Sequence, residues 1–167
     1  MKKALIDSLG RIAQVEFSTP FTASWPQHWV DCPDDCQAYI WGYAEGVCTP
    51  PDPALLLDMA KSAKIAQIER DRDTACIANV TAHARQWQAD NVSQRLLGDA
   101  ITLASAGLPL PAVWRDVTND NMPLAALSDL LAIAGAIAQQ TQTAYATAWA
   151  RKDAIDAATT VEAVEAA

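Results

Sequence analysis

Residues 124–158 form the longest uninterrupted helical pattern in the chain, and this run most constrains the fold. It contains a single glycine, Gly135, and no proline, so nothing in it forces a break. At a rise of about 1.5 Å per residue, a helix of this length spans roughly 50 Å. Any fold for this chain must therefore accommodate one very long helix.

The two halves of this run differ in composition. Its first half is apolar on nearly every side, through Leu124, Leu127, Leu130, Leu131, Ile133 and Ile137. Because such a helix must be covered on more than one face, we expect Leu130 and Leu131 to be buried. The second half is mostly Ala, Thr and Gln, with Tyr145, Trp149 and Ile155 as its large apolar groups. The pattern predicts either a core helix of one domain or a helix that packs against copies of itself.

The charge balance narrows the range of partners. The chain of 167 residues carries 20 acidic and 12 basic side chains, a formal net charge of −8. This argues against nucleic acid and against an anionic membrane, since both are bound through cationic groups. Only Ala4-Leu5-Ile6 stand between Lys2-Lys3 and Asp7, which is too short for the apolar region of a signal peptide. No stretch reaches the roughly 20 apolar residues of a membrane span. We expect a soluble protein made in a cytoplasm.

The first 48 residues are predicted to form a small antiparallel β module. Residues 3–17 read as a hairpin around Gly10, residues 29–33 as an edge strand ended by Pro33, and residues 39–43 as a further strand before a turn at 44–46. The expected sheet carries five aromatic side chains: Trp25, Trp29, Tyr39, Trp41 and Tyr43. They could stack on a sugar, but we favour a structural role, because so small a sheet needs bulky side chains to form any core.

A stiff Pro-rich connector at residues 49–53 is predicted to join this module to a helical body over residues 54–158. Asp52 is a plausible N-cap, with Pro53 at the first position of a helix that runs to about residue 79. The segment 69–73 alternates in charge, which is typical of a solvated or interface helix. Its carboxylates lie beside arginines that lower their pKa, the wrong direction for a general acid.

A second helix is predicted from the capping residues at 90–93 to about residue 106, with Gly107 ending it. Its expected buried face consists of Leu96, Leu97, Ala100, Ile101 and Leu103. Trp87 lies in a short extended piece before it. Trp114, Asp120 and Asn121 lie in the connector to the long helix, where Asn and Asp usually bond to neighbouring backbone. The tail, residues 159–167, is expected to be only weakly helical and weakly ordered.

The fold class predicted from these patterns is α+β. A small N-terminal antiparallel β module is joined by a Pro-rich linker to a mainly α-helical body with a long C-terminal helix. The residues expected to make interface or structural contacts are Trp29, Trp41, Trp87, Asp90, Trp114, Asp120, Asn121, Leu130, Leu131, Tyr145 and Trp149.

The residue types that usually carry chemistry do not form a known catalytic pattern. There is no Gly-rich phosphate loop, no H-E-x-x-H and no G-x-S-x-G. The spacing of His28, Cys32, Cys36 and Cys48 lacks the paired knuckles of structural zinc sites, and the default role for these thiols is that of small buried hydrophobes. Asp116 and Asp120 are a carboxylate pair without an evident partner acid. We therefore expect no enzyme activity, no cofactor and no metal.

Several separated blocks of the chain together resemble a known family. They are Ile65-x-x-Ile68-Glu69-x-x-Arg72-Asp73, Trp87-x-x-Asp90-x-x-Ser93-x-x-x-Leu97 and Trp114-Arg115-x-x-x-x-Asp120-Asn121-Met122-x-Leu124. In this order they resemble the phage domain of unknown function DUF4376, which occurs in tailed bacteriophages and prophages. The N-terminal third is similar to the lead-in segments of such phage proteins, through residues 4–7, 10–11, 29–35 and 41–46. The family usually has Thr after the last Leu of the third block, whereas Ala125 stands here.

The resemblance implies a protein of the tail or tail-fibre region, present in the virion and made in the host bacterial cytoplasm. It implies no activity. Two roles remain open: a structural component of the tail, tail fibre or baseplate, and an assembly chaperone that binds the fibre during folding. The expected partners are phage tail or tail-fibre proteins and further copies of this chain, with no nucleic acid and no membrane. A sugar-binding module built on the N-terminal tryptophans is a third, weaker alternative.

Overall fold

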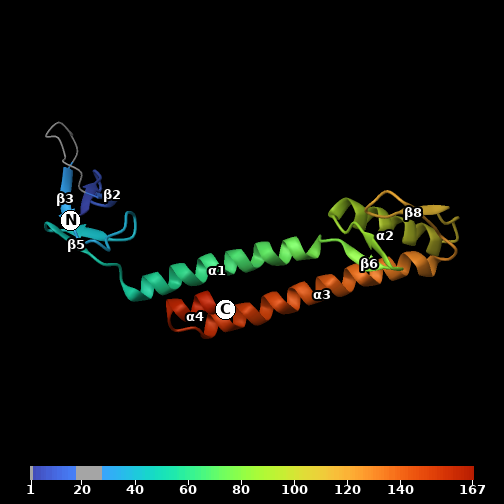
Figure 1. The fold of residues 1–167 in the computed structure, drawn as a ribbon. Coiled ribbons are helices and arrows are strands. Elements are labelled where there is room, and N and C mark those ends of the chain that lie inside the picture. The colour runs from blue at the N-terminus through green and yellow to red at the C-terminus, as the bar shows by residue number, and fades with distance from the viewer. Residues whose placement is uncertain (1, 18–27) are drawn as a thin grey trace. The chain divides into compact units, whose positions relative to one another are not determined.

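The computed structural model describes residues 2–17 and 28–167 and has an α+β fold with small antiparallel sheets and a long C-terminal helix (Figure 1). The chain divides into two compact units, Met1–Met59 and Ala60–Ala167. The division lies within helix α1 (Pro53–Cys76), a few residues after the Pro-rich segment 49–53.

Unit 1 contains a three-stranded antiparallel sheet in the order β2-β1-β3, formed by β1 (Lys2–Ile6), β2 (Ile12–Phe17) and β3 (His28–Cys32). Between β1 and β2, Gly10 adopts φ +75° and the Asp7 carboxylate accepts hydrogen bonds from the N–H groups of Leu9 and Arg11 at 2.8 and 2.9 Å. The predicted hairpin and edge strand are confirmed.

A separate two-stranded hairpin follows, made of β4 (Gly42–Ala44) and β5 (Val47–Thr49) around Glu45 and Gly46 at φ 53° and 87°. The predicted strand 39–43 is wrong in its first half: residues 38–40 form a turn with Tyr39 at φ 61°. The chain turns here because Cys36 and Ala38 are drawn against the core of unit 1. Trp25 lies outside the described residues.

The core of unit 1 is small. Its fully covered members are Ala4, Ile12, Cys32 and Cys36, and the half-buried side chains packed against it include Trp41, Tyr43 and Cys48. Trp41 and Tyr43 thus have the structural role expected of aromatic side chains in so small a sheet.

Unit 2 carries most of α1 and the rest of the chain. The Asp52 carboxylate accepts a hydrogen bond from the Ala54 N–H at 2.9 Å, which confirms the predicted cap. The helix ends at Cys76, about three residues earlier than expected, because Val80 is buried in a hairpin formed by β6 (Val80–Ala82) and β7 (Arg85–Trp87). The expected extended piece around Trp87 is therefore one strand of a pair.

Helix α2 (Asn91–Ser105) begins and ends as predicted, with Asp90 as its N-cap and Gly107 at φ +88° beyond its end. Its buried face is narrower than predicted. Leu97 is buried, but Leu96 and Leu103 are exposed, because α2 touches α3 along one side only. The connector that follows is a further hairpin, β8 (Val113–Arg115) and β9 (Asn121–Pro123).

Helix α3 (Leu127–Ala157) begins three residues after the predicted Leu124. Its N-cap, Ala126, has no side-chain oxygen, and the carboxylate of Asp129 instead accepts from the N–H groups of Ala125 and Ala126 at 2.8 and 3.0 Å. Asp129 thus supplies the half of a capping box that binds the backbone just before the helix, whereas the half that a Thr side chain would supply to the first turn is missing.

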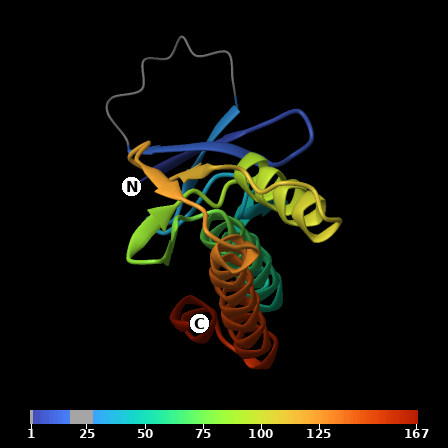
Figure 2. The same cartoon turned by 90° about the vertical axis from the view of Figure 1, so that its right-hand side faces the viewer.

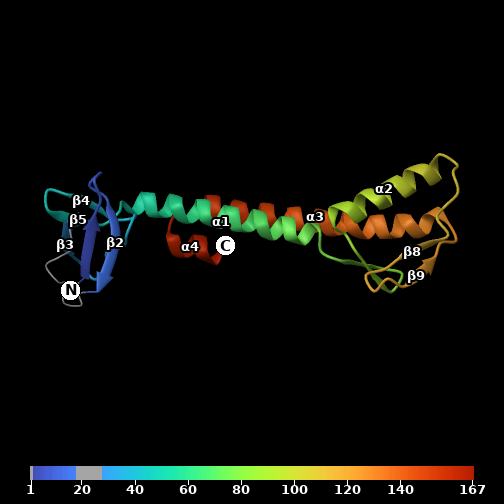
Figure 3. The ribbon, with the colours of Figure 1, turned by 90° about the horizontal axis from the view of Figure 1, so that it is seen from above.

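The main core of unit 2 surrounds the first half of α3. Helix α2 and the β6–β7 hairpin lie on opposite sides of α3, as Figure 2 shows in a view roughly along that helix; Figure 3 shows α2 beside α3 from above. The residues buried there are Val80, Trp87, Ala89, Leu97, Leu130, Ile133 and Ile137. Leu130 is fully buried as predicted, whereas Leu131 is 50% exposed and the expectation for it is wrong. Covering α3 on two sides still leaves a third side open.

The tail forms the short helix α4 (Val161–Ala166), and Val164 is only 1% exposed. The Thr160 hydroxyl accepts from the Ala163 N–H at 3.2 Å, and the Arg151 guanidinium donates to the Ala167 carbonyl at 2.9 Å. These contacts tie α4 beside the end of α3, a firmer arrangement than the expected weakly ordered tail.

Substituting the adjacent residues Leu130 and Leu131 tests the placement of α3. Leu130→Asp buries an unpaired carboxylate in the core of unit 2 and should lower the free energy of unfolding by more than about 3 kcal/mol. Leu131→Asp, the matched control, should cost about 1 kcal/mol or less because the side chain reaches solvent. Urea unfolding followed by circular dichroism measures both, and equal losses would contradict this placement.

Candidate protein-interaction surface

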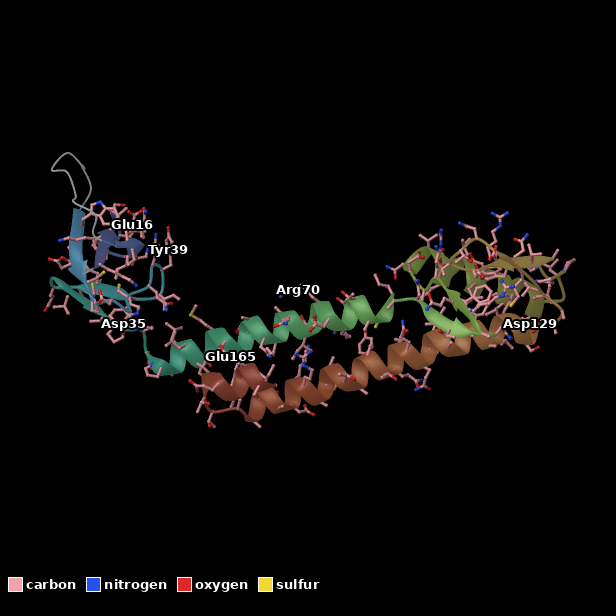
Figure 4. The ribbon with its side chains drawn as sticks, in the orientation of Figure 1. Glu16, Asp35, Tyr39, Arg70, Asp129 and Glu165 are labelled. Atoms are coloured by element: carbon pink, nitrogen blue, oxygen red, sulfur yellow. The ribbon has the colours of Figure 1, made fainter. Side chains whose placement is uncertain are left out.

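Within unit 2, α1 and α3 run antiparallel and are joined largely by long polar side chains (Figure 4). The Lys152 ammonium lies 2.6 Å from the Glu69 carboxylate, and the Arg151 guanidinium lies 3.3 Å from the Asp71 carboxylate. Hydrogen bonding from Lys152 lowers the pKa of Glu69. Exposed pairs of this kind contribute only about 0–1 kcal/mol each, so they orient the helices more than they stabilise them.

Two further bridges use backbone carbonyls. Gln140 on α3 donates from its side-chain amide to the carbonyls of Ala75 and Ala78 at 2.8 and 2.6 Å, where α1 ends. Lys61 donates to the Asp156 carbonyl at 3.1 Å. Gln140 therefore ties α3 to the last turn of α1 and to the residues just after it.

A groove of about 740 Å³ lies between these helices on one side. The surface that lines it is mainly apolar, and alanines and threonines contribute to it together with longer polar side chains such as those of Arg72 and Gln140. The residues that line it are Ile68, Asp71, Arg72 and Ala75 of α1, residues 78–81, and Ala136, Gln139, Gln140, Thr143, Ala144, Thr147, Ala148 and Arg151 of α3. Small side chains on facing helices leave room for the close approach of another polypeptide.

The same helix pair carries an exposed aromatic patch, which we define as Arg72, Tyr145 and Trp149. The Tyr145 and Trp149 rings meet edge to face, with centroids 5.8 Å apart and planes at 61°. The Arg72 guanidinium carbon lies 5.1 Å from the centre of the Tyr145 ring, and Arg72 is also paired with Asp73 at 2.6 Å. Tyr145 is 37% and Trp149 62% exposed. A Trp exposed to this degree on a rigid helix is typical of interface anchors.

Asp116 holds the hairpins of unit 2 together. One carboxylate oxygen accepts from the Thr118 hydroxyl at 2.7 Å and from the N–H groups of Thr118 and Asp120 at 2.9 and 3.0 Å. The other oxygen accepts from Arg85 on β7 at 2.8 Å. The Thr118 hydroxyl is the largest cause that lowers the pKa of Asp116, to about 2. A carboxylate held ionised in this way fixes structure and is unsuited to donate a proton at neutral pH.

The remaining predicted contact residues of unit 2 lie around its core. Trp87 is buried and donates from its indole N–H to the Ala82 carbonyl at 2.9 Å. Asp90 caps α2, and hydrogen bonds led by the Ser93 hydroxyl lower its pKa. Trp114 packs against the core from β8. Asp120 accepts weakly from Thr118 at 3.2 Å, and Asn121 is exposed on β9. These residues are structural, and they lie apart from Tyr145 and Trp149 in the chain.

In unit 1, Trp41 packs on the core and Trp29 lies half-buried on β3. Tyr39, labelled in Figure 4, is 75% exposed in its turn. The aromatic side chains predicted to lie together in this module thus have different surroundings: some pack on the core, and Tyr39 lies in an exposed turn.

Sequence reasoning missed Arg72, Gln140 and the central role of Asp116. Arg72 and Tyr145 lie far apart in the chain, and only the antiparallel pairing of α1 with α3 brings them together. The one signal for Asp116 was the spacing of Asp116, Thr118 and Asp120, which is typical of an Asx-type turn.

Within residues 2–17 and 28–167, no group of three or more His, Cys, Asp or Glu side chains is arranged to hold a metal ion. No helix of the same described stretches is both long and apolar enough to cross a bilayer.

The chain is thus an α+β protein whose helical unit presents a groove and an aromatic patch beside a compact core. Residues 59–167 match the family model described as Domain of unknown function (DUF4376), and the chain belongs to this family. No curated protein and no solved structure matches the chain.

The hydrogen bonds to Asp116 predict a specific order of pKa effects. Thr118→Val should raise the pKa of Asp116 from about 2 more than Arg85→Gln does, because the Thr118 hydroxyl is the leading cause of the depression. Carboxyl ¹³C titration by NMR measures this directly, and a larger shift in Arg85→Gln would contradict it. Since folding lowers this pKa, its stabilising contribution is complete above about pH 4 and is lost as the pH falls toward 2. The melting temperature of the wild type should therefore fall between about pH 4 and pH 2, and Asp116→Asn should make this fall smaller.

Proposed function

We propose that this protein is a structural component of the tail, tail-fibre or baseplate region of a tailed bacteriophage and acts through protein–protein contacts. Membership of the DUF4376 family supports the proposal, as does the resemblance to phage tail proteins in the residue blocks described above. The observation that carries it is the exposed aromatic patch, Arg72, Tyr145 and Trp149, on a helix pair joined by polar bridges.

The patch has the chemistry of a protein contact. Burying a Trp side chain from water contributes a few kcal/mol at about 25 cal/mol per Å² of apolar surface. Trp149 leaves most of that contribution unrealised, because it is 62% exposed. The Arg72 guanidinium, which is already paired with Asp73, packs over the Tyr145 ring and so adds a cation–π contact to the patch. Trp, Tyr and Arg are the residues most enriched among binding hot spots.

The partner in this proposal includes further copies of the same chain. Helices α1 and α3 form a single layer, so neither can cover both faces of the other. A further layer of structure would cover the faces that remain open. Around a symmetry axis, that layer is supplied by the equivalent helix of a neighbouring copy. Exposed small residues on α3, among them Ala132, Ala146 and Ala150, permit close approach of another helix.

A second candidate, a tail-fibre assembly chaperone, is favoured by the groove. A mainly apolar groove of about 740 Å³ with small side chains suits a segment of an unfinished fibre chain. Such a protein would bind the fibre during folding and need not remain in the particle.

Quantitative mass spectrometry of purified virions separates the two candidates. A structural component is expected at a fixed ratio to known tail proteins. Absence from the particles, combined with soluble fibre only when both genes are expressed together, would support the chaperone. Absence from the particles without any effect on fibre solubility would contradict both.

The role of the aromatic patch is tested by Trp149→Gln, with Leu103→Gln on α2 as the matched control. Both side chains are exposed, at 62% and 52%, so each substitution should change the free energy of unfolding by about 1 kcal/mol or less. We expect size-exclusion chromatography with light scattering to show an oligomer for the wild type and the control, and about tenfold weaker association for Trp149→Gln. A monomeric wild type, or unchanged association of Trp149→Gln, would contradict self-contact through this patch.

A further inference from the structure

Three of the four cysteines meet in unit 1, although they come from three separate segments. Cys32 ends β3, Cys36 lies in the loop that follows, and Cys48 is the middle residue of β5. Cys32 and Cys36 are 5% and 2% exposed, and Cys48 is half-buried against the same core. Cys76, on α1 in unit 2, lies outside this core.

Cys36 is the centre of this thiol cluster, which we define as Cys32, Cys36 and Cys48. Its thiol lies in the same small core as the other two, and burial raises its pKa to about 12, with the neighbouring Cys32 and Cys48 adding to the effect. Burial also raises the pKa of Cys48, whose sulfur donates a weak hydrogen bond to the Asp31 carbonyl at 3.9 Å. All three are free thiols that share one small core, and a bond between two of them requires their Cβ atoms to lie about 4 Å apart.

We infer that Cys36 and Cys48 form an intramolecular disulfide when the protein meets a low-molecular-weight disulfide. Cys48 is the thiol that the reagent can reach, because it is the least covered member of the cluster. Its thiolate attacks the reagent R–S–S–R, giving a mixed disulfide on Cys48 and one R–SH. Cys36 then loses its proton, and its thiolate attacks the Cys48 sulfur and expels the second R–SH. Because burial raises the pKa of both thiols, the reaction is slow at neutral pH and faster at higher pH. Two protein thiols are oxidised to one disulfide while one R–S–S–R is reduced to two R–SH.

The bond would join two parts of unit 1 that the sheets do not connect directly. It closes residues 36–48, a segment that contains the Tyr39 turn and strand β4. A closed loop restricts the unfolded chain and so stabilises the folded state. Cys32 would remain a thiol, since only one bond can form at Cys36. The inference does not depend on the proposed function, because it requires only contact with the oxidant.

The test treats the full native chain with oxidised glutathione and maps the product by intact mass and peptide mass spectrometry. A Cys76→Ser background removes the thiol outside the cluster. We expect loss of two hydrogens, a Cys36–Cys48 linked peptide, and an apparent melting temperature of unit 1 raised by roughly 5 °C or more. Dithiothreitol should reverse both changes.

Single substitutions separate the roles of the three thiols. Cys36→Ser should stop at one glutathione adduct on Cys48, because the second step has lost its nucleophile. Cys32→Ser, the matched control, should still form the Cys36–Cys48 bond. A Cys32–Cys36 bond in the native chain, an adduct that persists on Cys48 while Cys36 is present, or four unreacted thiols would each overturn the inference.

Discussion

The fold of unit 2 depends on the burial of the first half of α3. Leu130, Ile133 and Ile137 are covered by α2 on one side and by the β6–β7 hairpin on the other. Each such side chain contributes about 1.5–3 kcal/mol when it is fully buried. Beyond residue 140 this cover ends, and α3 continues beside α1 through polar bridges until Ile155 and Val164 are buried near its end. The helix is therefore longer than the core that holds it, and its middle part is where surface remains open.

Much of this architecture could be predicted from local sequence signals. Asp52, Asp90, Gly10 and Gly107 mark element ends through their own side chains or backbone freedom, and each acts as expected. The errors arise where contacts between distant parts of the chain decide whether a residue is buried or a segment turns. Leu131 is as apolar as Leu130, but the side of α3 to which it belongs has no covering element. The segment before β4 has the composition of a strand, yet it turns, with Cys36 buried in the core just before the turn and Ala38 packed against that core. Local composition cannot show which faces the rest of the chain will cover.

The same limit applies to the candidate site. Tyr145 and Trp149 could be singled out because they are the large aromatic groups in an Ala-rich stretch. Arg72 could not, because its contact with Tyr145 depends on the register between two helices. Two contacts between α3 and α1 fix that register: Gln140 bonds to the backbone near the end of α1, and Lys152 bonds to Glu69. Polar bridges that contribute little to stability thus decide which side chains share a surface, and this is why the site is harder to predict than the fold.

The cores of the two units are built differently. Unit 2 shares one long helix among several elements, so a single set of buried leucines and isoleucines orders α2 and the hairpins together. Among the residues of unit 1 that the structure describes, four are buried in its core, and two of these are cysteines. Modules of this size usually need a staple in addition to their apolar core. Cysteine is well suited to such a place, because it packs as a small hydrophobe when reduced and crosslinks without a change of sequence when oxidised. A thiol cluster in the small core of unit 1 therefore links the stability of this unit to the redox state of its surroundings.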